Sequence, residues 1–119
     1  VVLCLGKIYY ELLERFEESE QDKKRTSNIA VIRIEQLHPF PQDALQTLLE
    51  RYGHHVKVVW LQEEPRNMGA WPFISMHYQG DIAEAIARPA SGTTAAGSQV
   101  IYARKHDVIM DDVMKYARK

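Results

Sequence analysis

Short apolar runs alternate along this chain with segments whose apolar residues recur at helical spacing. The runs Val1–Leu5, Ile29–Ile34 and Val56–Leu61 are bounded by glycine or polar residues, which is typical of buried strands. Between them, apolar residues recur every three or four positions: Ile8, Tyr9, Leu12, Leu13 and Phe16 in one segment, and Ala44, Leu45, Leu48, Leu49 and Tyr52 in the other. The pattern predicts a helix from Lys7 to about Glu20 and a second that begins near Pro41 and stops at Gly53.

The predicted strands are continuously apolar rather than alternating. Strands of this kind are covered by helices on both faces and pair in parallel, and the crossovers between them are right-handed. The order strand, helix, strand, helix, strand therefore predicts an α/β fold with three layers, in which a mostly parallel sheet lies between two layers of helices.

The second half of the chain is less regular. A helix is predicted from Pro72 to about Gln79 and another from Asp107 to Lys119, each from apolar residues at helical spacing. Ile82–Ala87 stays ambiguous, because its alanine and glutamate residues favour a helix whereas its short length permits a strand. Residues 90–98 are predicted to form a loop, and Gln99–Ala103 an edge strand or loop.

The polar segment Gln62–Trp71 follows the third predicted strand directly. In open α/β sheets, functional groups gather at the carboxyl ends of the strands, and charged residues follow the predicted strands at this position. We group them with residues of the polar segment as one candidate interface or effector site, called the charged edge below: Lys7, Glu35, Glu63, Glu64, Arg66, Asn67, Trp71 and Arg88. A mixed charged edge of this kind suits a protein interface or a small anionic effector.

No catalytic pair is expected at the charged edge. Neighbouring residues of a strand point to opposite faces, so Glu63 and Glu64 are not expected to act together as acid and base on one substrate. Two roles stay open: one carboxylate caps the following helix or pairs with Arg66 or Arg88, and the other faces a ligand. No dinucleotide-binding loop, P-loop or serine-hydrolase elbow has the required spacing. We therefore predict no catalytic or cofactor-binding residue in this chain.

Metal binding and thiol chemistry are not expected either. None of the five histidines has the i, i+4 spacing of a helical zinc pair, and the sequence has a single cysteine. That residue, Cys4, lies inside an apolar run and is predicted to be a buried strand residue rather than a reactive thiol. A chain without a disulfide fits a reducing compartment.

Length and charge limit the remaining classes of protein. The chain has 119 residues, 45% of them hydrophobic, which is enough for a single domain over 1–119 with its own core. Its 15 basic and 16 acidic residues nearly balance, so neither nucleic acid nor a membrane is an expected partner. Because the chain opens in a predicted strand without an initiator methionine, we expect it to be a C-terminal fragment of a much longer multidomain enzyme.

Four segments of the chain together resemble a known enzyme family. They are Cys4–Tyr10, Arg33–Pro41, Gln62–Trp71, and Arg88–Ser91 with Ala96-Gly97. They resemble the C-terminal domain of the thiamine-diphosphate-dependent dehydrogenase component of the 2-oxoglutarate dehydrogenase complex, over nearly the whole chain. The resemblance implies a fold like the transketolase C-terminal domain, with a mainly parallel sheet of about five strands that includes Ile82–Ala87.

The resemblance also implies a parent enzyme that does the chemistry elsewhere. Such an enzyme decarboxylates 2-oxoglutarate in the tricarboxylic acid cycle on thiamine diphosphate and Mg²⁺, which the preceding domains hold. It then passes the succinyl group to the lipoyl-bearing succinyltransferase component. This chain would be a structural, dimerisation or regulatory domain, inactive alone, whose partners are the preceding domains and the second subunit.

Location and rival interpretations follow from the same resemblance. The expected location is the cytoplasm in bacteria or the mitochondrial matrix in eukaryotes. The alternatives are the equivalent domain of another thiamine-dependent 2-oxoacid dehydrogenase or of transketolase, and a free-standing protein-interaction module.

Overall fold

The computed structural model describes residues 1–21, 28–53, 55–90 and 99–118. In chain order its elements are β1 (Val2–Cys4), α1 (Ile8–Gln21), β2 (Val31–Arg33), α2 (Gln42–Glu50), β3 (Val59–Pro65), α3 (Trp71–His77), β4 (Glu84–Arg88), α4 (Gln99–Met114) and the 3-10 helix η1 (Lys115–Arg118). The strands form one parallel sheet in the order β2-β1-β3-β4, in which Leu3 lies opposite Ile32 on one side and Trp60 on the other. The predicted parallel α/β fold is confirmed, with four strands in the described part of the chain instead of about five.

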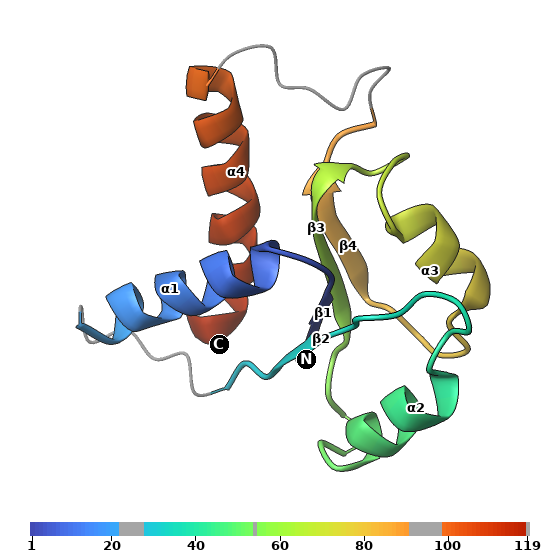
Figure 1. Cartoon of the computed structure of the whole chain (residues 1–119). Coiled ribbons are helices and arrows are strands. Elements are labelled where there is room, and N and C mark those ends of the chain that lie inside the picture. The colour runs from blue at the N-terminus through green and yellow to red at the C-terminus, as the bar shows by residue number, and fades with distance from the viewer. Residues whose placement is uncertain (22–27, 54, 91–98, 119) are drawn as a thin grey trace.

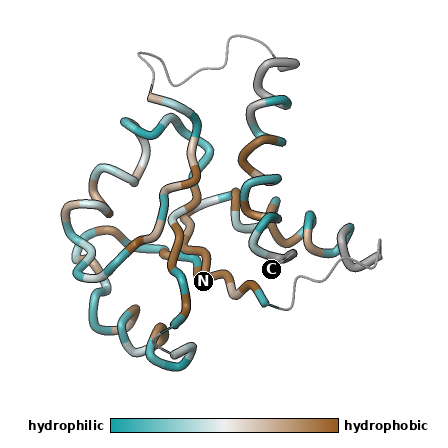
Figure 2. Tube along the Cα trace, turned by 180° about the vertical axis from the view of Figure 1, so that it is seen from behind, coloured by the Kyte–Doolittle hydropathy of each residue, from teal (hydrophilic) through white to brown (hydrophobic). Residues whose placement is uncertain are grey.

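Helices cover both faces of the sheet, as predicted (Figure 1). On one face, Val2, Cys4, Val59 and Leu61 of the strands pack with residues of α1 and α4, among them Ile8, Leu12, Ile109, Met110 and Val113. On the other face, Leu3, Trp60 and Ala85 pack with Leu45 of α2 and Ile74 of α3. The alternation of side chains along each strand supplies both cores, and Figure 2 shows the strands as a hydrophobic band through the middle of the molecule.

Three segments depart from the local sequence pattern. β3 continues through polar residues to Pro65, four positions beyond the predicted end at Leu61. The ambiguous segment is a strand, β4, as the resemblance implied. The prediction of an edge strand or loop over Gln99–Ala103 is wrong, because these residues form the first part of α4. Later turns of α4 bury Ile109 and neighbouring residues against the sheet, and such packing stabilises a helix beyond its local propensity.

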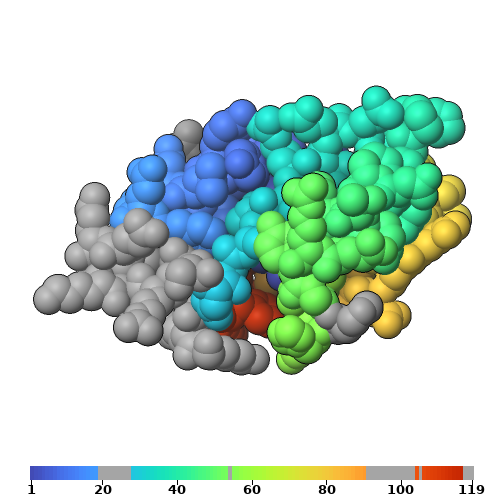
Figure 3. Space-filling model, turned by 90° about the horizontal axis from the view of Figure 1, so that it is seen from below, coloured from blue at the N-terminus to red at the C-terminus, as the bar shows by residue number. Residues whose placement is uncertain are grey.

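Two further features concern the ends of the elements. The predicted loop over 90–98 lies outside the described residues except for residue 90. At the amino-terminal edge of the sheet, Val1, Ile29, Val56 and Tyr116 line a hollow of about 570 Å³, which Figure 3 shows between the cyan, green and red segments. Within the described ranges, no helix has the length and apolarity needed to cross a bilayer.

Candidate functional site

The charged edge lies where the chain changes direction across the sheet. From β1 the chain passes to β2 on one side and then returns to β3 on the other, so β1 and β3 flank a topological switch point. Ligands of open α/β sheets bind outside the strand ends at such points. Gly6 ends β1 in a left-handed conformation with φ of 82°, and the turn places Lys7 at the start of α1 beside Glu63 of β3.

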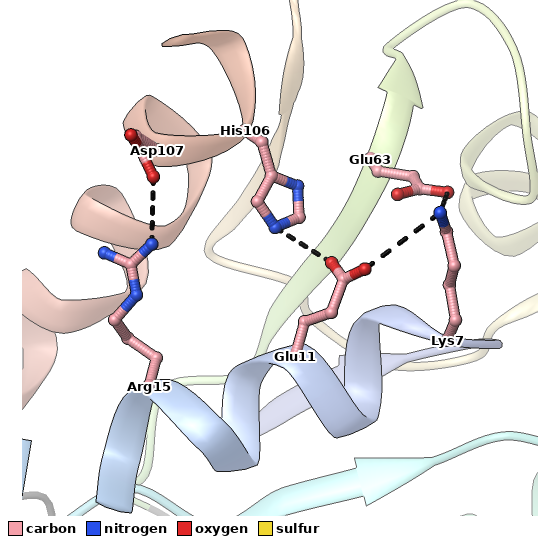
Figure 4. Close-up of polar contacts among 6 residues, drawn as sticks. All are labelled: Lys7, Glu11, Arg15, Glu63, His106 and Asp107. Atoms are coloured by element: carbon pink, nitrogen blue, oxygen red, sulfur yellow. Dashed lines mark hydrogen bonds and ion pairs between the residues drawn. The ribbon is translucent and has the colours of Figure 1, made fainter. Parts of the chain in front are cut away.

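Lys7 and Glu63 belong to a cluster of four polar side chains from three elements (Figure 4). Lys7 Nζ lies 3.8 Å from Glu63 Oε1 and 4.0 Å from Glu11 Oε1. On the other side of Glu11, its Oε2 lies 2.8 Å from Nε2 of His106, a residue of α4. The structure therefore joins two predicted site residues to two that the sequence did not single out.

A second pair of contacts lies one helical turn further along α1. The Arg15 guanidinium donates a hydrogen bond to Asp107 of α4 at 3.0 Å (Figure 4). It also lies 3.8 Å from the Asp111 carboxylate. Together with the Glu11–His106 contact, these charges connect α1 to α4 along one line.

The turn after β3 is organised by Gln62, whose side chain is 3% exposed. Its amide Nε2 donates to the carbonyl oxygens of Pro65 at 2.9 Å and Met68 at 2.8 Å. Its Oε1 accepts hydrogen bonds from the Trp60 indole and from the backbone N–H of Trp71, each at 2.9 Å. One buried amide thus fixes both ends of the turn.

This arrangement contradicts the helix-capping role considered for one of the glutamates. The N-cap of α3 is Ala70, and no side chain caps the helix. The Trp71 N–H at the helix start is satisfied by Gln62 instead of by a carboxylate. The expectation that Glu63 and Glu64 point to opposite faces is confirmed: Glu63 is on the α1 and α4 face beside Lys7, whereas Glu64 is on the opposite face, where it approaches Gly69.

Both arginines of the charged edge donate to backbone carbonyls across β3 and β4. Arg66 Nη2 donates to Ala85 O at 3.0 Å, and Arg88 Nε donates to Glu63 O at 2.8 Å. Arg88 is buried, with 8% of its surface exposed, whereas Arg66 and Asn67 are exposed on the turn. These arginines therefore hold the strand ends together, and the tip of the turn also offers polar groups to a partner.

Glu35 lies at the far side of the charged edge. Its carboxylate accepts a hydrogen bond from Arg33 at 2.5 Å, and the same guanidinium donates to the Tyr10 hydroxyl at 2.6 Å. These two hydrogen bonds raise the pKa of Arg33. The guanidinium also lies over the rings of Tyr9 and Tyr10, 4.9 and 5.2 Å from their centres. Lys7, Tyr10 and Glu35 line a shallow hollow between β1 and β2.

The charged and polar groups at this edge suit recognition of a partner or a small ion. None of the eight residues is a serine, threonine or cysteine. The one cysteine, Cys4, is fully buried in β1, as predicted, and burial raises its pKa to about 12, so that it stays a thiol at neutral pH.

The fold and this edge define a parallel α/β domain with a charged surface at its switch point. Residues 1–114 match the family model described as 2-oxoglutarate dehydrogenase C-terminal. The chain belongs to this family, and the resemblance found in the sequence is confirmed.

Relatives in several organisms agree with this assignment. The chain is 36% identical to the 2-oxoglutarate dehydrogenase E1 component of Haemophilus influenzae and 38% identical to that of Coxiella burnetii, over 98% and 97% of its length. It is also 37% identical, over 92% of its length, to the 2-oxoadipate dehydrogenase complex component E1 of Danio rerio. The chain spans 12% of the length of each of these relatives.

Proposed function

We propose that this chain is the C-terminal accessory domain of an E1 component that oxidatively decarboxylates 2-oxoglutarate, and that it contributes no catalytic group. The observation that carries the proposal is the set of contacts that the charged edge makes within the domain. Its two arginines bond to backbone carbonyls and its Lys7 lies beside carboxylates, so these groups have partners within the domain instead of converging on a substrate.

In this proposal the cofactor belongs to other domains of the parent. Thiamine diphosphate with Mg²⁺ would supply the decarboxylation chemistry there. The described residues of this chain do not fit that group: their one cluster of possible metal ligands contains an imidazole and two carboxylates. Mg²⁺ prefers oxygen ligands and usually keeps several waters, and two carboxylates would repel the diphosphate. We therefore assign this chain no step of the reaction.

The exposed tip of the turn is proposed as a contact surface of the assembled enzyme. Gln62 fixes the turn in advance, so little conformational entropy is lost when Arg66 and Asn67 meet a partner surface. The partner would be a preceding domain or the second subunit of a homodimer, within a complex that includes the lipoyl-bearing succinyltransferase component. The proposed location remains the bacterial cytoplasm or the mitochondrial matrix.

A direct test compares the isolated chain with its parent. The 119-residue chain should show no saturable binding of thiamine diphosphate with Mg²⁺ by calorimetry and no turnover of 2-oxoglutarate. The parent should lose dimer assembly and turnover when the region corresponding to 1–119 is deleted. Turnover by the chain alone, or full activity of the truncated parent, contradicts the proposal.

Point variants of the parent test the turn itself. Arg66→Ala should weaken assembly, measured as the dimer dissociation constant by analytical ultracentrifugation. Arg51→Ala is the matched control, because Arg51 is an exposed arginine at the end of α2, outside the charged edge. Assaying the unmodified parent with 2-oxoglutarate and with 2-oxoadipate also decides between the two substrates named for the relatives. An unchanged dissociation constant for Arg66→Ala removes the turn from the interface.

A further inference from the structure

A half-buried group of metal-ligand side chains lies at the switch point, and the mechanism proposed for the parent does not use it. Glu11, Glu63 and His106 each present one ligand atom, and these atoms lie within 4.8 Å of one another. They come from α1, β3 and α4, three elements distant in sequence (Figure 4). Their side chains are 31%, 22% and 17% exposed, so that the group is shielded from bulk water but reachable.

The spacing is close to that of ligands sharing one ion. Nitrogen and oxygen ligands lie about 2.0–2.2 Å from Zn²⁺, and two of them in a tetrahedral arrangement are about 3.4 Å apart. His106 Nε2 and Glu11 Oε2, which are 2.8 Å apart, would separate by about 0.6 Å to admit the ion. The widest separation, within 4.8 Å, would close by about 1.4 Å, which a rotamer change of a glutamate side chain can supply.

The position of Lys7 shows that the space between the Glu11 and Glu63 carboxylates favours a positive charge. Its ammonium lies between the two carboxylates, 3.8 Å from Glu63 and 4.0 Å from Glu11. Its side chain is 65% exposed, and ion pairs of such exposure contribute little to stability. A small divalent cation can therefore displace the ammonium into solvent at a small penalty.

We propose that Glu11, Glu63 and His106 form a binding site for a first-row divalent cation of the Zn²⁺ type, with Lys7 as its built-in competitor. One imidazole and two carboxylates suit Zn²⁺ better than Ca²⁺ or Mg²⁺, which prefer oxygen ligands only. Water completes the coordination. Because the ligands span three elements, the bound ion fastens α4 to α1 and to the end of β3. The site does not depend on which 2-oxoacid the parent uses.

Cobalt and zinc titrations of the full 119-residue chain test this site. After treatment with a chelator, the chain is titrated with Co²⁺, whose visible absorption reports coordination, and then with Zn²⁺ to displace it. One equivalent should bind, and Zn²⁺ should raise the midpoint of thermal unfolding. Glu63→Gln and His106→Gln should each weaken binding by at least about tenfold. Lys7→Gln should tighten it by about fivefold, because the competing charge is gone.

The control is His77→Gln, which removes an exposed histidine of α3 on the other side of the sheet and should leave affinity unchanged. Circular dichroism checks that each variant is folded. If either ligand variant fails to fold, Lys7→Gln decides the question, because Lys7 is exposed and its prediction has the opposite sign. Absence of saturable binding, equal weakening by His77→Gln, or no gain in Lys7→Gln overturns the proposal.

Discussion

Replacing Gln62 by methionine tests whether one buried amide holds the turn after β3. Methionine has a similar length and fills a similar space without polar amide atoms. The substitution leaves the Trp60 indole N–H and the Trp71 N–H without their acceptor. It also removes the side-chain donor from the carbonyls of Pro65 and Met68, although the Pro65 carbonyl still accepts the Met68 N–H.

The expected loss follows from how deeply each partner is buried. The Trp60 ring is fully buried, so that its stranded N–H costs about 1–3 kcal/mol. The hydrogen bonds to the Met68 carbonyl and from the Trp71 N–H are part-buried, where water can replace part of each, and the Pro65 carbonyl keeps the Met68 N–H. These three losses cost about 0.5–1 kcal/mol apiece. The sum, about 2.5–6 kcal/mol, is a large part of the roughly 5–15 kcal/mol that stabilises a typical domain.

Urea unfolding at neutral pH measures this loss. Trp60→Phe removes the indole N–H that Gln62→Met leaves without an acceptor. The double variant with both substitutions should therefore lose less unfolding free energy than the two single variants added together, by about 1–2 kcal/mol. Gln46→Met, an exposed glutamine on α2, is the matched control and should stay within about 0.5 kcal/mol of the wild type. A loss below about 1 kcal/mol for Gln62→Met, or additive effects in the cycle, refutes the assignment of Gln62 as the organiser of the turn.

Three further predictions concern single residues of the core, the turn and the α1–α4 contact. Burial raises the pKa of Cys4 from 9.0 in the unfolded chain to about 12 in the folded one. The stability that the neutral thiol contributes to the fold is therefore complete below pH 9.0 and is lost as the pH rises toward 12. Urea unfolding at pH 10.5 should therefore show a loss of about 2 kcal/mol that Cys4→Ala lacks. Gly69→Ala should lower the unfolding free energy by about 1–2 kcal/mol, and by more than Gly6→Ala. Both glycines have positive φ, but only at Gly69 would the new Cβ meet a neighbour, Glu64 Oε2 at 2.9 Å. Arg15→Gln should cost less than about 1 kcal/mol, and high salt should abolish the difference, because its partners are exposed.

The sheet and its helices could be predicted because they follow from side-chain periodicity. β1 and the first half of β3 are continuously apolar, and α1 and α2 have clear apolar faces. β4 needed the resemblance, since Glu84–Arg88 has the local composition of a helix and is a strand because Ala85 and Ile86 are buried on opposite faces of the sheet. The start of α4 was missed for a similar reason, since packing further along the helix stabilises it.

The position of the candidate site could be predicted from the sequence, but the hydrogen bonds and ion pairs between its side chains could not. The rule that polar groups gather at strand ends placed Lys7 and Glu63 at the switch point. Glu11 was within reach of sequence reasoning, because it lies one helical turn after Lys7. His106 was not, because its position depends on how α4 crosses α1. For Gln62, nothing in the local sequence distinguishes a buried amide from a surface one.

The polar end of β3 serves two separate sites because the strand continues through it. Had the strand ended at Leu61, residues 62–64 would have formed a loop, and their side chains would not have been assigned to particular faces of the sheet. As a strand, this segment directs Gln62 and Glu64 to the α3 face and Glu63 to the α1 and α4 face. Changes at Gln62 should therefore alter the turn and its contact surface while sparing the cation site. Changes at Glu63 should do the reverse, since side chains on opposite faces of a sheet share no partner.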